Sequence, residues 1–134
     1  MSLREGLTFE LKRTVTEADL ADRHGNQWVH VFTTPKVVEW MEEVTTQGVQ
    51  DHLPEGQGTV GTVVNMKHLA ATPVGLTVKV VAHLKQIDGR RLVFWLEAFD
   101  DVEKIAECHH ERFIVDLARF HDKAAKKRGA SAAR

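Results

Sequence analysis

One long helical pattern, set among strand-like segments, most constrains how this chain folds. Apolar residues recur at helical spacing over residues 34–51, and Pro54 and Gly56 end the pattern. Pro35 suits the first turn of a helix because its missing N–H has no partner there, and Thr34 is expected to be the N-cap. One long helix beside an antiparallel sheet predicts an α+β fold.

The other segments have the alternation of β-strands. Strands are predicted over residues 7–15, 59–69, 76–86, 91–100 and 104–115. Asp88-Gly89 is a strong signal for a hairpin between the third and fourth of these strands. Residues 16–19 have the pattern of a capping box and predict a short helical turn. Residues 116–127 predict a short closing helix.

Length and composition are those of one ordinary globular domain. The chain has 134 residues, of which 43% are hydrophobic and 28% are charged, and its formal net charge is −1. We expect a single domain over residues 1–122, which is long enough to bury a core. Residues 123–134 contain the basic run 126–128 and are expected to form a flexible, solvated tail.

Composition also bears on partners and on compartment. A net charge near zero favours neither a nucleic acid nor a membrane as partner. Cys108 is the only cysteine, so no intramolecular disulfide can form, and a reducing cytoplasm fits. The start of the chain lacks the apolar run of a signal peptide, and no apolar stretch is long enough to span a bilayer. We therefore expect a cytoplasmic protein.

Glu42 has an unusual place on the predicted helix. Helical periodicity puts Glu39 and Glu43 on the solvent-facing side, whereas Glu42 lies at the edge of the apolar arc. That arc consists of Val37, Val38, Met41, Val44, Thr45, Gly48 and Val49. A carboxylate at its edge is partly removed from water, which favours a partner or a role as general base. The alternative is a boundary residue whose carboxylate reaches solvent.

A hydroxyl and an imidazole accompany this carboxylate in the sequence. Thr34 precedes Glu42 by eight residues, and His68 stands near the end of the second predicted strand. A hydroxyl, a carboxylate and an imidazole together suit acyl transfer or hydrolysis. Structural alternatives stay open, because Thr34 also suits a helix cap and a lone histidine in a strand is commonly structural.

The chain has no established metal or nucleotide motif. Cys108, His109 and His110 are adjacent, but neighbouring strand residues point to opposite faces and cannot both bind one ion. The Cys-x-x-Cys, His-Glu-x-x-His, Gly-x-Ser-x-Gly and Walker patterns are absent from the sequence. We expect neither a metal nor a cofactor. Gly61 has no side chain, which would let a ligand approach the backbone closely.

Three blocks of sequence resemble one enzyme family. They are residues 58–78, the hairpin at residues 88–92 and the tripeptide His110-Glu111-Arg112. In order and content they are similar to the fluoroacetyl-CoA thioesterase-like branch of the hot-dog acyl-CoA thioesterases, and the similarity extends over residues 7–120. The resemblance implies a hot-dog fold, in which an antiparallel sheet wraps around a long central helix.

The resemblance also implies roles for particular residues. The family's catalytic threonine, glutamate and histidine correspond to Thr34, Glu42 and His68. Gly61 corresponds to a glycine that lines the acyl site, and Arg112 to an arginine of the last strand. The segment before the helix is shorter than the Phe- and Pro-rich lid of the fluoroacetyl-specific enzyme. A small or medium acyl-CoA is therefore as consistent with the sequence as fluoroacetyl-CoA.

The sequence thus predicts an acyl-CoA thioesterase that releases an acid and CoA. Glu42 would activate water or act as a nucleophile, His68 would assist proton transfer, and Thr34 would position the reacting groups. The alternatives are a non-catalytic acyl-CoA-binding module and a hot-dog hydratase or dehydratase that acts on enoyl thioesters. An unpaired sheet edge predicts a homodimer with the acyl site near its interface, and dimers can pair further into tetramers.

Overall fold

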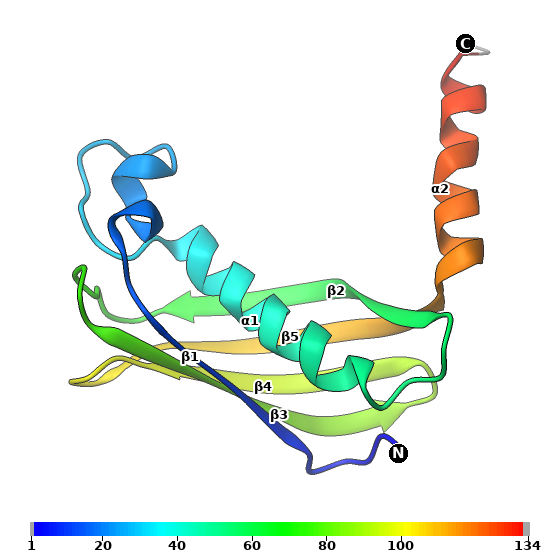
Figure 1. The fold of residues 1–134 in the computed structure, drawn as a ribbon, viewed down its shortest axis with the longest axis horizontal. Coiled ribbons are helices and arrows are strands. Elements are labelled where there is room, and N and C mark those ends of the chain that lie inside the picture. The colour runs from blue at the N-terminus through cyan, green and yellow to red at the C-terminus, as the bar shows by residue number, and fades with distance from the viewer. Residues whose placement is uncertain (1, 133–134) are drawn as a thin grey trace.

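A five-stranded antiparallel sheet and one long helix form the body of the protein (Figure 1). The computed structural model describes residues 2–132. The strands lie in the order β1-β3-β4-β5-β2, and each neighbouring pair is antiparallel. They are β1 (Thr8–Thr14), β2 (Gln57–His68), β3 (Thr77–Asp88), β4 (Arg91–Phe99) and β5 (Lys104–Asp116). The predicted α+β fold is confirmed.

Two helices and two short 3₁₀ turns complete the fold. They are η1 (Glu17–Asp19), η2 (Ala21–Arg23), α1 (Thr34–Gln50) and α2 (Leu117–Ala132). Helix α1 lies across one face of the sheet, whereas α2 follows β5 and projects away from the body (Figure 1). The predicted capping box is present, since the Thr16 N–H donates to the Asp19 carboxylate over 2.8 Å. No helix within residues 2–132 combines the length and the apolar character needed to cross a membrane.

Helix α1 is held on the sheet by one apolar face. Its buried residues are Val37, Trp40, Met41, Val44, Thr45 and Val49. They face the inward-pointing residues of the sheet, which in β4 are Leu92, Phe94, Leu96 and Ala98. Trp40 falls outside the arc predicted from the sequence, yet it is 2% exposed, with its ring 4.5 Å from that of Phe32. Phe32 precedes the helix and closes the core at that end.

The N-terminus of α1 differs from the sequence prediction by one residue. Thr33 is the N-cap, with extended backbone, and Thr34 is the first residue with helical geometry. The prediction that Thr34 caps the helix is therefore wrong. Thr33 is buried, whereas Thr34 is exposed at the end of the helix. The shift leaves the Thr34 hydroxyl available for a contact outside the helix.

Strand β2 forms one edge of the sheet. It pairs with β5 along one side only, and a bulge interrupts the pairing between Gly61 and Val63. Residues 61–65 are all exposed, including the apolar side chains of Val63 and Val64. A long, exposed edge with apolar side chains is a template for pairing with another strand.

Helix α2 is longer than the sequence predicts. It continues to Ala132, so residues 123–132, for which a basic tail is expected, extend this helix. Residues 133–134 lie outside the described part of the chain. None of the residues in α2 is buried. The boundary between domain and tail at residue 122 stays a prediction.

Candidate active site

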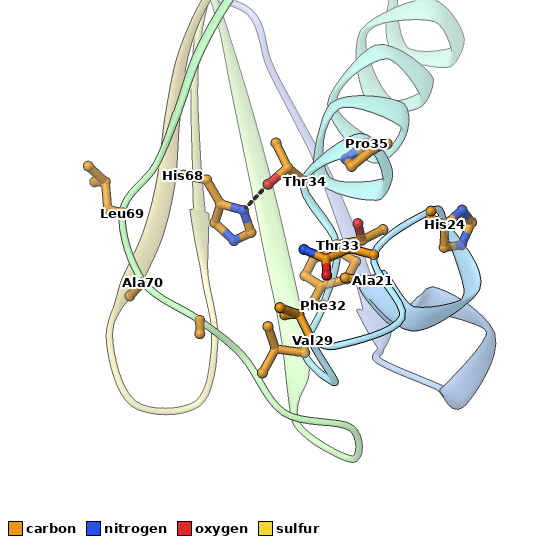
Figure 2. A pocket seen from close by; sticks show the side chains of 14 residues that line it. Ala21, His24, Val29, Phe32, Thr33, Thr34, Pro35, His68, Leu69 and Ala70 are labelled. Carbon is orange, nitrogen blue, oxygen red and sulfur yellow. Dashed lines mark hydrogen bonds between the residues drawn. The ribbon is translucent and has the colours of Figure 1, made fainter.

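The structure brings Thr34 and His68 together where α1 begins and β2 ends. The Thr34 hydroxyl and His68 Nδ1 form a hydrogen bond of 2.8 Å (Figure 2). His68 Nε2 is buried and has no hydrogen-bond partner within residues 2–132. Burial lowers the pKa of His68, although a backbone hydrogen bond with Ala70 opposes the shift. The imidazole is therefore mainly neutral near pH 7 and can accept a proton.

A pocket of about 530 Å³ opens beside this pair. Figure 2 shows His68, Leu69 and Ala70 on one side of it and Thr34, Phe32 and Val29 on the other, with the Thr34 hydroxyl bonded to His68 between them. Thus the segment between η2 and α1 faces the turn that follows β2. The pocket has no Lys or Arg among the described residues that line it.

Glu42 belongs to a second cluster, further along α1 over the middle of β2. Its carboxylate lies 3.6 Å from Arg112 Nη1. A Cβ at Gly61 would stand 2.5 Å from Glu42 Oε2, so any larger residue would push the carboxylate away from its present place against this strand. The Glu42 side chain is 42% exposed, so one side of the carboxylate is open to solvent or substrate. The predicted position of Glu42, at the edge of the apolar face, agrees with this geometry.

Arg112 is fixed rigidly beneath that carboxylate. Its side chain is 5% exposed, and burial lowers its pKa while Glu42 raises it. The guanidinium donates from Nε to the Thr59 hydroxyl over 2.9 Å and from Nη2 to the Thr59 carbonyl over 3.1 Å. These bonds leave Nη1 directed towards Glu42. Arg112 therefore supplies a fixed positive charge beside the carboxylate.

His110 completes this cluster and was not identified from the sequence as a site residue. It is 1% exposed, and its Nδ1 lies 2.7 Å from the Val63 carbonyl oxygen, to which it can only donate. Nε2 is then left to accept the Arg112 Nη1 proton over 3.2 Å. Burial lowers the pKa of His110 and keeps it neutral, as this arrangement requires. Alternation along β5, which turns His110 and Arg112 to the same face, is the signal that could have found it.

The neighbouring His109 points to the other face of the sheet, as predicted for adjacent strand residues. Its Nε2 lies 2.7 Å from Glu111, which also accepts a hydrogen bond of 2.7 Å from Arg91. The Arg91 hydrogen bond is the main cause that lowers the pKa of Glu111 to about 2, and His109 adds to it. Within residues 2–132, no three His, Cys, Asp or Glu side chains are grouped as metal ligands would be.

The five predicted site residues thus form two clusters in one chain. Thr34 and His68 make the first, and Glu42, Gly61 and Arg112 make the second. Thr34 and Glu42 are eight residues apart on α1, which corresponds to about 12 Å along a helix. The two clusters therefore do not meet through these contacts within one subunit.

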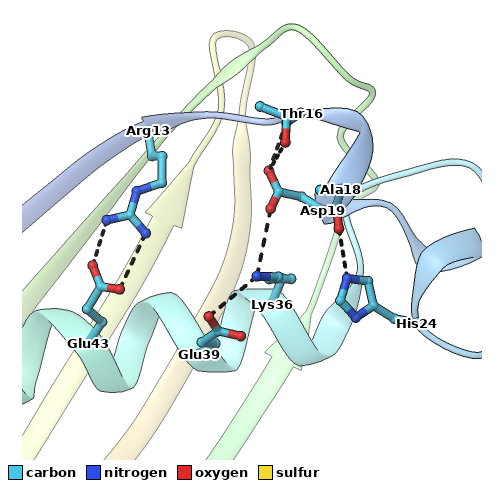
Figure 3. Close-up of polar contacts among 8 residues, drawn as sticks. All are labelled: Arg13, Thr16, Ala18, Asp19, His24, Lys36, Glu39 and Glu43. Carbon is cyan, nitrogen blue, oxygen red and sulfur yellow. Dashed lines mark hydrogen bonds and ion pairs between the residues drawn. The ribbon is translucent and has the colours of Figure 1, made fainter.

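Glu39 and Glu43 are not equivalent, contrary to the prediction that both face solvent. Glu43 accepts a hydrogen bond of 2.6 Å from Arg13 (Figure 3). The Arg13 guanidinium also lies over the Trp40 ring. Among residues 2–132, Glu39 pairs only with Lys36, at 3.4 Å, and its side chain is 59% exposed. The expectation of a fully solvated Glu43 is therefore wrong, whereas Glu39 does face solvent.

Comparison with known proteins assigns the chain to a family. The sequence model of the fluoroacetyl-CoA-specific thioesterase family, FlK, matches residues 15–118. This chain belongs to that family of thioester hydrolases. The fluoroacetyl-CoA thioesterase of Streptantibioticus cattleyicolor is 38% identical over 101 residues, which cover 75% of this chain and 73% of that protein. The resemblance inferred from the sequence is confirmed.

Solved structures agree with this assignment. A mutant of the fluoroacetyl-CoA thioesterase FlK in complex with acetyl-CoA superposes with a TM-score of 0.88 and is 31% identical, covering 93% of this chain and 98% of that one. A hot-dog-like protein from Thermanaerovibrio acidaminovorans superposes with a TM-score of 0.86 at 20% identity, covering 93% of each chain. The latter likeness shows the fold alone, and the predicted hot-dog fold is confirmed.

Proposed function

We propose that this member of the family hydrolyses a small or medium acyl-CoA to the free acid and CoA, and that it does so in the cytoplasm. The observation that carries the proposal is the pair of clusters along β2. One presents a neutral imidazole held by a hydroxyl, and the other presents a carboxylate held by a buried arginine. A relative in the same family has been solved with acetyl-CoA, which fits a short acyl chain.

A homodimer brings the two clusters together. The free edge of β2 spans Gln57–His68, and residues 61–65 along it are all exposed. The proposed pairing has its centre between Val64 and Asn65. Two copies that pair antiparallel about a two-fold axis at this centre place Gly61 opposite the partner's His68. Because Glu42 lies over Gly61, it would face that imidazole. Pairing would also bury the edge and the exposed Val63 and Val64.

The chemistry then follows from the groups that meet. Glu42 removes a proton from water, the hydroxide adds to the thioester carbonyl, and the developing oxyanion lies near the Thr34 N–H at the start of the partner's α1. The C–S bond breaks, and the thiolate of CoA takes a proton through His68. In the covalent alternative, Glu42 attacks the carbonyl to form an anhydride, which water then hydrolyses. Thr34 holds His68 in orientation in both routes.

A panel of acyl-CoA thioesters of increasing chain length tests the proposal. Release of free thiol together with the acid supports a thioesterase, and we expect it for short chains. An enoyl-CoA hydratase would change the acyl chain without releasing thiol. A binding module would bind acyl-CoA without turnover, and either result would overturn the proposal.

The acid side of the pH profile gives a second test. Since burial lowers the pKa of His68, the neutral imidazole persists below the usual titration range. Activity should fall as the pH drops through that lowered pKa. His68→Ala should lower the rate and flatten this acid limb. If His68→Ala lowers the rate by the same factor at every pH, so that the pH profile keeps its shape, His68 has a positioning role only.

A further inference from the structure

Helix α2 is anchored to its own subunit at one end only. The Leu117 N–H donates to the Gly56 carbonyl over 2.9 Å, and the Leu117 side chain covers Gly58. Beyond this first turn every residue is exposed, and the helix projects past the β2 edge (Figure 1). A helix of 16 residues is marginal in water without packing. The structure of one subunit therefore leaves this helix without the contacts that would stabilise it.

Helix α2 has many more basic than acidic residues. It carries five basic residues and one acidic residue, Asp122. The basic residues are Arg119, Lys123, Lys126, Lys127 and Arg128. Asp122 forms an ion pair with Lys126, with 3.4 Å between Oδ2 and Nζ. The helix thus offers a row of cations to an anionic partner.

The pocket beside Thr34 and His68, by contrast, is poor in positive charge. No Lys or Arg stands among the described residues that line it. The CoA portion of an acyl-CoA carries several phosphate charges, which proteins ordinarily bind with Lys, Arg or helix N-termini. The described lining of this pocket therefore supplies no Lys or Arg for those phosphates.

Two-fold pairing of β2 places α2 at the partner's pocket. With the axis between Val64 and Asn65, the Gly58 end of β2, beside which α2 begins, lies near the partner's segment that follows His68 and contains Ala71. Ala71 is one of the residues that line the pocket. A 16-residue helix is about 24 Å long, which equals the width of roughly five strands. Since α2 extends beyond β2, it reaches across the partner's edge.

We propose that α2 of each subunit lies beside the partner's Thr34–His68 pocket and that Lys123, Lys126 and Lys127 bind the CoA phosphates there. The inference rests on the proposed function and its dimer. Apolar side chains exposed on both surfaces support the contact. On α2, Phe120 is 40% exposed, and beside the pocket Leu69 is 52% exposed and Val29 is 37% exposed.

Substrates with and without phosphates test the role of these lysines. A variant with Lys123→Gln, Lys126→Gln and Lys127→Gln should raise KM for acyl-CoA about tenfold, since exposed charge pairs each contribute modestly. The N-acetylcysteamine thioester of the same acyl group carries no phosphate, so its kcat/KM should not change. Gln keeps the helix propensity of Lys, so the helix should persist.

A matched variant controls for net charge. Lys12→Gln, Lys79→Gln and Lys85→Gln remove the same charge from β1 and β3, at the opposite side of the sheet from β2. KM for acyl-CoA should then stay at its wild-type value. Equal KM changes in the two triple variants, or equal effects on both thioesters, would overturn the inference. A wild-type protein that hydrolyses neither thioester, or that is an active monomer, would instead overturn the proposed function or its dimer.

Mixed dimers test whether α2 acts on the partner. One subunit carries His68→Ala with an intact α2, and the other carries the Lys123, Lys126 and Lys127 substitutions with an intact His68. The one site that retains His68 then faces the intact α2, so we expect a near wild-type KM for acyl-CoA. The raised KM of the lysine-substituted homodimer would show that α2 acts within its own subunit, contrary to the inference.

Discussion

The two helices are nearly equal in length, 17 residues in α1 and 16 in α2, yet only α1 is packed. Six residues of α1 are buried against the sheet, whereas no residue of α2 is buried. The buried stripe of α1 fixes the direction of each of its side chains, including Glu42. Helix α2 has no such stripe against its own sheet, and in the proposed dimer its place is fixed by the partner subunit. The comparison separates a helix whose packing positions Glu42 from a helix that is exposed on its own subunit and that we propose binds substrate on the partner.

The largest effect is expected for the carboxylate that α1 directs towards Gly61. Glu42→Gln should lower kcat by roughly 10²–10⁴, the usual contribution of acid–base catalysis, with an unchanged fold. Turnover of a short acyl-CoA measures kcat, and a circular dichroism spectrum tests whether the fold is unchanged. Glu39→Gln on the exposed side of α1 is the control and should be silent. Glu43→Gln is not a suitable control, because Glu43 pairs with Arg13. A near wild-type rate for Glu42→Gln would remove it from the mechanism.

Packing of α1 can be tested with a matched pair of tryptophans. Trp40→Ala should lower the free energy of unfolding by about 3–5 kcal/mol, because it leaves a cavity against Phe32. Trp28 is 77% exposed, and Trp28→Ala should change that free energy by no more than about 0.5 kcal/mol. Urea unfolding monitored by circular dichroism measures both. Similar values for the two variants would contradict the packing of α1.

Glycines within the two helices sharpen the contrast. A Cβ at Gly48 of α1 would stand 2.6 Å from Phe9 Cδ1, whereas a Cβ at Gly129 of α2 would meet nothing within 4 Å. Gly48→Ala should therefore destabilise the protein by about 1–3 kcal/mol through overpacking. Gly129→Ala should leave the unfolding midpoint unchanged and raise the helical signal slightly. A loss of stability in Gly129→Ala would indicate that α2 packs where the structure leaves it exposed.

The smallest effect is expected at the first residue of α1. Thr34→Ala should lower kcat about tenfold, since it removes one hydrogen bond to His68. Stability should change little, because Thr33 rather than Thr34 is the N-cap. Thr34→Ser keeps the hydroxyl and should retain most of the activity. If Ser and Ala variants lose activity equally, the hydroxyl does not position His68.

Local sequence patterns predict much of the fold. The hairpin at Asp88-Gly89 forms as expected, with Gly89 at a positive φ of 60° that favours glycine. The periodicity of α1 correctly placed Glu42 at the edge of the buried face. The same periodicity missed Trp40, because its burial depends on Phe32 and on Arg13 of β1, which both lie outside the helix.

The site was harder to predict than the fold. Sequence spacing suggests one group made of Thr34, Glu42 and His68, but it does not give the distance between groups on a helix and a strand. The structure separates Glu42 from the other two and adds His110 beside Arg112. In the proposed dimer the two clusters meet through a second subunit, and no pattern within one chain records such a contact.

The central claim is that Glu42 of one subunit works with the partner's His68. Dimers that combine a Glu42→Gln subunit with a His68→Ala subunit test it most directly. Each homodimer should be nearly inactive, and in the mixed dimer one of the two shared sites carries neither substitution. We predict that the purified mixed dimer recovers about half of the wild-type kcat per dimer, because one site of two is intact. Activity no greater than the mean of the two parent homodimers would contradict the shared site.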